Sequence, residues 1–272
     1  EYAIVYNGEL YNTGELARDL RQSGYEFSTT TDTEVILYAY MQYGASFVRK
    51  LNGIFAFAIW DDSKKQLLLY RDRVGIKPLF YSFVSGQLLF ASEPKALFCF
   101  PGFTPRVSMD GIREVLAIGP ARTMGNGIFD DVNEVLPDHT YWDLFRAPHT
   151  DSYEQTVETV SFLLRDSVTR QMVSDVPVCT FLSGGIDSSI VTAIACRYME
   201  KHGETLNTFS FDFKDNDIYF KSNAFQPERD LPYVKIMLDH YHTNHTCLEC
   251  DENTLFSALR DAVDAKVKWK DR

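Results

Sequence analysis

The stretch that decides the fold is VCTFL at residues 178–182, followed directly by SGGIDSS at residues 183–189. The apolar first part predicts a buried strand, and a helix is expected from about Asp187 to His202. Between them, two adjacent glycines let the backbone turn tightly, so that successive N–H groups can form an anion-binding nest beside three serine hydroxyls. Because ligands of parallel sheets bind beyond the carboxyl ends of the strands, the stretch predicts a phosphate or pyrophosphate site.

The composition of this loop argues against two common kinds of phosphate-binding site. The patterns GxxxxGK(S/T) and GxGxxG are absent from the sequence, which argues against a P-loop phosphotransferase and a Rossmann dinucleotide site. Asp187 would repel a phosphate unless its carboxylate holds a divalent cation or caps the helix, so the loop implies Mg²⁺. The alternative is an ordinary helix N-terminus rich in Ser, Gly and Asp.

Strands and helices alternate on both sides of this loop. The sequence predicts a helix over 156–173, a strand over Leu206–Phe213, a helix over Glu228–Asp239, a strand over Thr243–Cys247 and a helix over Asn253–Val263. Such alternation predicts parallel strands with right-handed crossovers in a doubly wound sheet. Three strands are few for a sheet of this kind, so we expect this domain, residues 147–272, to be incomplete at its C-terminal end.

The first half of the chain, residues 1–146, has a different pattern. An opening strand at Tyr2–Tyr6 is followed by two amphipathic helices, one from Thr13 to Gly24 and one from Thr31 or Thr33 to Gly44. The continuously apolar run Ile54–Trp60 predicts a strand buried between two layers. Further strands are expected at Gln66–Tyr70, Leu79–Phe83 and Gln87–Ala91, and a linker between about Pro101 and His149. We therefore predict an antiparallel sandwich with helices on its faces.

Four motifs in this order resemble the glutamine-hydrolysing asparagine synthetase family. They are YNGELYN at 6–12, LNGIFAFA at 51–58, RDRVGIKPL at 71–79, and SGGIDSS after an apolar strand. The resemblance runs from about Tyr2 to Ala265. It implies an N-terminal-nucleophile glutaminase domain of the class II amidotransferase type, followed by an ATP-pyrophosphatase synthetase domain.

The resemblance also implies a reaction and its site residues. Members of the family use ammonia from glutamine to amidate aspartate through β-aspartyl-AMP, with ATP and Mg²⁺, and release AMP and pyrophosphate. It implies that Asn7 and Gly8 stabilise the oxyanion and that Asn7, Gly8, Glu9 and Asp32 bind glutamine. It further implies that Asp187 holds Mg²⁺ and that ATP is bound by Leu182, Ser183, Gly184, Gly185, Asp187, Ser188, Ser189 and Phe211. Without the resemblance, Asn7-Gly8 is more typical of a tight turn and Asp32 of a helix cap, and Leu182 and Phe211 are equally typical of core residues.

The sequence departs from the family at its ends. The family's catalytic cysteine is the mature N-terminal residue, which none of the five cysteines here matches, and the basic segment from Lys266 to Arg272 does not resemble the family. We therefore expect truncation at both ends. Two other functions stay open: a catalytically inactive chain that acts as a binding or regulatory subunit, and a ligase that adenylates another carboxylate, as β-lactam synthetases do on the same scaffold.

The composition of the chain restricts the classes of partner that it is expected to bind. The 272 residues carry a net charge of −11, which disfavours nucleic acid and anionic membranes, and no apolar run is long enough to span a bilayer. We expect a cytoplasmic protein whose partners are the small molecules glutamine, aspartate and ATP; a homodimer is one assembly open to it. Cys247 and Cys250 have CxxC spacing, but in a strand they would point to opposite faces, so we do not expect zinc.

Overall fold

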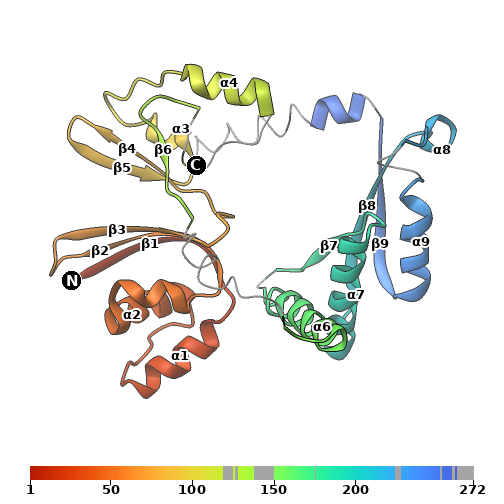
Figure 1. Ribbon diagram of the computed structural model, residues 1–272, viewed down its shortest axis with the longest axis horizontal. Helices are drawn as coiled ribbons and strands as arrows, with labels where there is room; N and C mark the ends of the chain where they lie inside the picture. The colour runs from red at the N-terminus through yellow and green to blue at the C-terminus, as the bar shows by residue number, and fades with distance from the viewer. Residues whose placement is uncertain are drawn as a thin grey trace. The chain divides into compact units, whose positions relative to one another are not determined.

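Figure 1 shows the fold as a computed structural model. It describes residues 1–118, 125, 128–137, 150–174, 176–223, 228–251, 253–258 and 261. The chain divides into two compact units, Glu1–His149 and Thr150–Arg272. Each unit has its own sheets and its own core.

An antiparallel sheet with strand order β1-β2-β3 opens the first unit. It is formed by β1 (Tyr2–Leu10), β2 (Gly53–Asp61) and β3 (Gln66–Arg71). Along β1, half-buried and exposed residues alternate, whereas β2 is buried without interruption from Phe55 to Ile59. Because a strand alternates its side chains between two faces, this pattern places β2 between two layers, as the sequence predicts.

Two helices, α1 (Thr13–Gln22) and α2 (Asp32–Tyr43), cover one face of this sheet. Their apolar residues recur at helical spacing and meet the sheet in one cluster. The largest fully buried members of that cluster are Leu20, Ile36, Phe47 and Phe57. Phe47 comes from a 3₁₀ helix, η1 (Gly44–Lys50), which the sequence pattern does not reveal. This core fixes the strand that carries Asn7 and Gly8.

A second sheet with order β5-β4-β6 completes the first unit. It contains β4 (Phe80–Val84), β5 (Gln87–Ala91) and β6 (Asn133–Glu134), with α3 (Pro94–Leu97) and α4 (Met109–Ile118). The prediction of a linker from Pro101 is wrong for α4 and β6. A strand of two residues has no periodicity to detect, and β6 exists because it pairs with β4.

The motif RDRVGIKPL, residues 71–79, forms the connection from β3 in the first sheet to β4 in the second. The side chain of Arg71 forms an ion pair of 2.6 Å with Glu134, and both side chains are about nine-tenths buried. The carboxylate of Asp72 is buried and accepts the backbone N–H groups of Val74, Ile76 and Lys77. Together the two side chains hold the turn that follows β3.

The second unit contains one parallel sheet with strand order β7-β8-β9. Its elements are α6 (Tyr153–Arg170), β7 (Cys179–Phe181), α7 (Ile186–Lys201), β8 (Leu206–Phe213), α8 (Asn216–Tyr219), α9 (Leu231–His240) and β9 (Thr243–Cys250). Residues 253–258 are helical, and most of the rest of the helix predicted up to Val263 lies outside the described residues. The predicted fold class, antiparallel sheets followed by a parallel α/β sheet, is confirmed.

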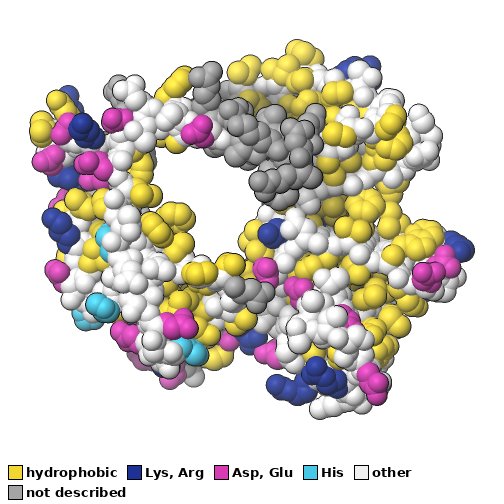
Figure 2. Space-filling view, turned by 180° about the vertical axis from the view of Figure 1, so that it is seen from behind, with side chains coloured by type: hydrophobic (Ala, Val, Ile, Leu, Met, Phe, Trp, Pro, Cys, Tyr) yellow, Lys and Arg dark blue, Asp and Glu magenta, His cyan; other side chains and the backbone are white. Residues whose placement is uncertain are grey.

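One face of the parallel sheet stays exposed among the described residues. Phe181, Phe211, Phe213 and Leu248 are between 47 and 76% exposed, and the strand register places them on the same face. Figure 2 shows apolar side chains at the surface of this unit. Parallel sheets are usually covered on both faces.

The opposite face of the sheet holds a short chain of polar groups. The imidazole of His245 lies 2.9 Å from the hydroxyl of Thr208 through Nδ1 and 3.0 Å from that of Ser210 through Nε2. Both hydroxyl residues are buried. Burial lowers the pKa of His245 below its ordinary value, so the folded protein favours the neutral ring.

This arrangement predicts a pH-dependent stability. As the pH falls below about 6.5, the unfolded chain takes up a proton that the folded chain excludes, and the free energy of unfolding should decrease. His245→Gln keeps a donor and an acceptor for the two hydroxyls but does not titrate. Urea unfolding between about pH 7 and pH 5 should therefore show a flatter slope for this variant. The exposed His242, changed to Gln, is the control and should keep the slope of the parent protein.

Candidate functional site

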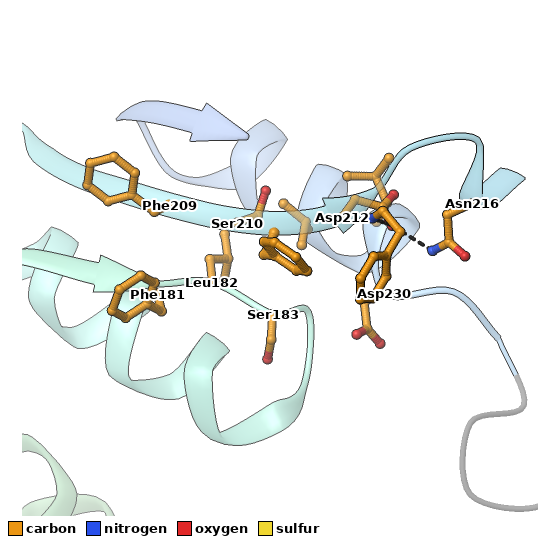
Figure 3. Close-up of a pocket in the computed structure, with 12 residues that line it drawn as sticks. Phe181, Leu182, Ser183, Phe209, Ser210, Asp212, Asn216 and Asp230 are labelled. Atoms are coloured by element: carbon orange, nitrogen blue, oxygen red, sulfur yellow. Dashed lines mark hydrogen bonds between the residues drawn. The ribbon is translucent and has the colours of Figure 1, made fainter. Parts of the chain in front are cut away.

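A cavity of about 260 Å³ lies at the carboxyl ends of β7 and β8 (Figure 3). Its apolar lining includes Phe181, Leu182, Phe209, Phe211, Phe213, Leu231 and Val234, and its polar lining is Ser183, Ser210, Asp212, Asn216 and Asp230. The position agrees with the rule that ligands of parallel sheets bind beyond the carboxyl ends of the strands.

The loop of residues 183–189 begins at this cavity. Leu182 is buried, and its N–H donates to the carbonyl of Phe209 at 2.7 Å, which extends the parallel ladder past β7. The hydroxyl of Ser188 lies 2.9 Å from that of Ser183 and donates to the carbonyl of Gly185 at 3.1 Å. These bonds fold the loop back onto the start of α7.

The start of α7 suits an anion. Gly185 is the N-cap residue, and no side chain makes a capping hydrogen bond there. The first N–H groups of a helix lack intrahelical partners, so they are available to a ligand. Asp187 lies exposed in the first turn and does not cap the helix.

Sequence reasoning finds part of the cavity. Leu182, Ser183 and Phe211 line it, and Phe211 is 52% exposed, so its interpretation as a core residue is wrong. Gly184 and Gly185 lie in the loop that follows, Asp187, Ser188 and Ser189 lie at the start of α7, and none of these five residues lines the cavity. Asp212 and Asn216 were missed; the signal that could have found them is their place at the carboxyl end of β8.

The cysteine pair lies in one continuous strand. β9 extends to Cys250, three residues beyond its predicted end. Cys247 is exposed and Cys250 is buried. The alternation of a strand directs their thiols to opposite faces, as the spacing argument requires.

In the first unit, Asn7, Gly8 and Glu9 lie in the middle of β1, so the interpretation of Asn7-Gly8 as a turn is wrong. Gly8 is opposite Phe55 on β2. The N–H of Phe55 donates to the carboxylate of Asp72 at 3.3 Å and its carbonyl accepts the N–H of Asp72 at 2.7 Å, both toward β3. Gly8 and Phe55 therefore form a non-hydrogen-bonded pair, and the N–H of Gly8 points to the edge of the sheet.

Asp32 lies at the same edge of β1. Its carboxylate accepts the N–H of Leu10 at 3.3 Å and the hydroxyl of Tyr6 at 2.7 Å. Since Leu10 is two residues from Gly8, the two N–H groups point the same way. Burial, and then the hydrogen bond to Asp32, raise the pKa of Tyr6 well above its ordinary value. The phenol therefore stays protonated and holds the carboxylate at this edge.

The side chains of Asn7 and Glu9 are exposed on the other face of β1. The amide nitrogen of Asn7 donates to the hydroxyl of Ser92 at 3.2 Å, a residue that directly follows β5. Sequence reasoning missed Ser92 and Tyr6. The structure thus brings the N–H of Gly8 and the carboxylate of Asp32 to one edge, with Asn7 and Glu9 on the adjoining face.

The two halves of the chain match known protein families. Residues 1–153 match the glutamine amidotransferase domain, and residues 159–267 match asparagine synthase. The first match defines the class of the N-terminal unit as a glutamine amidotransferase. The chain belongs to the glutamine-hydrolysing asparagine synthetase family.

Relatives in this family are longer than the chain. Asparagine synthetase (glutamine-hydrolysing) 3 of Bacillus subtilis is 45% identical over 97% of this chain and 45% of its own length. The amidase chyE of Penicillium rubens is 33% identical over 95% of this chain and 40% of its own length. The chain therefore spans less than half the length of these two curated relatives.

A solved structure of glutamine phosphoribosylpyrophosphate amidotransferase from B. subtilis, complexed with ADP and GMP, aligns with a TM-score of 0.34 and 15% identity over 78% of this chain and 55% of that one. Across the part of the chain that the structure describes, no helix combines the length and the apolar character that a membrane span requires.

Proposed function

We propose that the protein to which this chain belongs amidates aspartate to asparagine, with ammonia taken from glutamine and with ATP converted to AMP and pyrophosphate. The observation that carries the proposal is the loop of residues 183–189, which joins β7 to the uncapped start of α7 beside a cavity of about 260 Å³. The membership of the family supports glutamine as the source of ammonia.

In the second unit, the proposed site places the pyrophosphate of ATP at the start of α7 and the nucleoside against Leu182 and Phe211. An oxygen of the aspartate side chain attacks the α-phosphorus, and the bond from that phosphorus to the bridging oxygen of pyrophosphate breaks. The N–H groups after Gly185 and the hydroxyls of Ser183 and Ser188 stabilise the charge on the leaving pyrophosphate. Ammonia then attacks the acyl carbon of β-aspartyl-AMP, AMP leaves, and a proton is released.

In the first unit, the proposed glutamine site lies at the edge of β1. The N–H of Gly8 and the amide of Asn7 donate to the oxyanion that forms at the glutamine side chain. Asp32 pairs with the ammonium group of the substrate, and Glu9 lines the pocket. Asn7 changes partner from Ser92 to the oxyanion when the substrate is present.

The residues present fit a Mg²⁺ ion. The carboxylate of Asp187 is exposed in the first turn of α7, next to the proposed pyrophosphate site, and carboxylate oxygen is a ligand that Mg²⁺ prefers. When bound, the ion supplies positive charge to the pyrophosphate oxygens. Asp187 would hold the ion beside the loop.

Exchange of labelled pyrophosphate into ATP tests the proposal. The whole protein should catalyse this exchange only when aspartate is present, because exchange requires reversible formation of the acyl-AMP. Asp187→Asn should weaken the exchange at least about tenfold and leave glutamine hydrolysis unchanged, since an amide oxygen holds a divalent cation less strongly than a carboxylate. No exchange with any carboxylate would contradict the proposal and favour a binding or regulatory role.

A second candidate is a ligase that adenylates another carboxylate. It is favoured by one observation: a relative of 33% identity is named an amidase rather than an asparagine synthetase. Exchange that depends on a different carboxylic acid, with aspartate inactive, would establish this alternative.

A further inference from the structure

Asp212 contributes to the polar lining of the cavity and lies outside the stretch of residues 183–189. It lies near the end of β8, between Phe211 and Phe213 in the sequence, and the alternation of the strand directs its side chain to the face opposite to their rings. In Figure 3, Asp212 and Asn216 lie together at one side of the cavity, apart from Ser183. If the phosphates of ATP lie at Ser183 and α7, the carboxylate of Asp212 is at the nucleoside side.

The carboxylate is held in place by three donors. Oδ1 accepts the N–H of Phe213 at 2.9 Å and the side-chain amide of Asn216 at 2.6 Å. Oδ2 faces the guanidinium of Arg229 at 3.4 Å, and the side chains of this pair are 25 and 17% exposed. A carboxylate has about four acceptor positions, so the long contact to Arg229 leaves Oδ2 able to accept from a ligand.

We infer that Asp212 is a specificity-determining residue that selects the base of the nucleotide by accepting a hydrogen bond from its exocyclic amine. This inference rests on the proposed function of the cavity. Adenine has an amino group at C6, whereas guanine and hypoxanthine have a carbonyl oxygen there. A carboxylate can only accept, so it pairs with the amine and repels the carbonyl. The apolar lining of the cavity, which includes Leu182, Leu231 and Val234, suits a planar base.

Nucleotide binding to the whole protein tests this inference. The parent protein should bind ATP at least about tenfold more tightly than inosine triphosphate, because a carboxylate that faces a carbonyl oxygen brings two acceptors together without a proton between them. Asp212→Asn offers an amide that can donate to the carbonyl, so it should bring the two affinities within about threefold of each other. The exposed Asp217, which lies in α8 outside the cavity, provides the control: Asp217→Asn removes the same charge and should keep the preference for ATP.

The ribose hydroxyls are the competing partners of Asp212. If the carboxylate contacts the ribose, Asp212→Asn will change the ratio of the affinities for ATP and 2′-deoxyATP. The ratio of the affinities for ATP and inosine triphosphate will then stay unchanged. This result overturns the inference. The parent protein gives a test that needs no variant. Purine riboside triphosphate, which has hydrogen at C6, should bind more weakly than ATP and more tightly than inosine triphosphate. Equal affinities for all three also overturn the inference.

Failure of the proposed function is a separate result. A parent protein that binds no nucleotide contradicts the site itself and with it the role of Asp212. A protein that binds ATP without preference for its base contradicts only the role of Asp212.

Discussion

Replacement of Gly8 by alanine should prevent the first unit from folding stably. A Cβ at this position would overlap the carbonyl oxygen of Ile54 and lie 2.7 Å from the Cα of Phe55, both on β2. Both contacts are with backbone, so a side-chain rotation cannot relieve them and the strands must separate. We expect a loss in the free energy of unfolding above the ~1–3 kcal/mol of ordinary overpacking, measured by urea denaturation.

Gly14→Ala is the matched control for this change. A Cβ at Gly14 has no heavy atom within 4 Å, and the residue lies in α1, where alanine favours the helix by up to about 1 kcal/mol. The control should be as stable as the parent protein or slightly more stable. If both variants unfold at the same urea concentration, the close approach of β1 and β2 at Gly8 is not as described.

Gly184→Ala should damage both the fold of the nucleotide loop and its ligand affinity. Gly184 has a φ of +81°, and a Cβ there would lie 2.6 Å from the carbonyl oxygen of Asp230 at the start of α9. The left-handed backbone alone costs an alanine about 1–2 kcal/mol, and the clash displaces the loop from α9. Because a shift of about 1 Å can reduce activity a hundredfold, we expect ATP affinity to fall by ten- to a hundredfold.

Gly185→Ala separates these two effects. A Cβ at Gly185 meets only the hydroxyl of Ser183, at 3.5 Å, which is an ordinary contact. The stability of the variant should therefore equal that of the parent protein, while ATP affinity falls because the Cβ enters the space proposed for pyrophosphate. Urea denaturation and ATP titration of both variants, with glutamine hydrolysis as the control activity, measure the difference. Unchanged ATP affinity in both variants would show that the loop does not hold the nucleotide.

The parallel sheet and its loop could be predicted from the sequence, and the reasons are physical. Apolar strands alternate with helices at clear periods, and the glycine pair at 184–185 stands where a strand must turn into a helix. Secondary elements that depend on distant partners were not predictable in this way. β6 consists of two residues that become a strand only through β4, and η1 (Gly44–Lys50) has too few turns to show a period.

In the candidate sites, too, the features that depend on contacts between distant residues could not be predicted from the sequence. Asn7-Gly8 is compatible with a turn until the hydrogen bonds of Phe55 toward β3 fix the direction of the Gly8 N–H. The role of Asp212 likewise depends on contacts with Asn216 and Arg229 that no local pattern contains.

The hydrogen bonds between Asp72 and Phe55 depend on the register of β3 against β2. The hairpin from β2 to β3 is closed by Asp61, which is buried and accepts hydrogen bonds from Ser63 and Lys64. An insertion that shifted β3 against β2 by one residue would turn every side chain of β3 to its other face. Asp72 would then leave Phe55, although neither residue had changed. A shift of register by one residue is therefore incompatible with this hairpin.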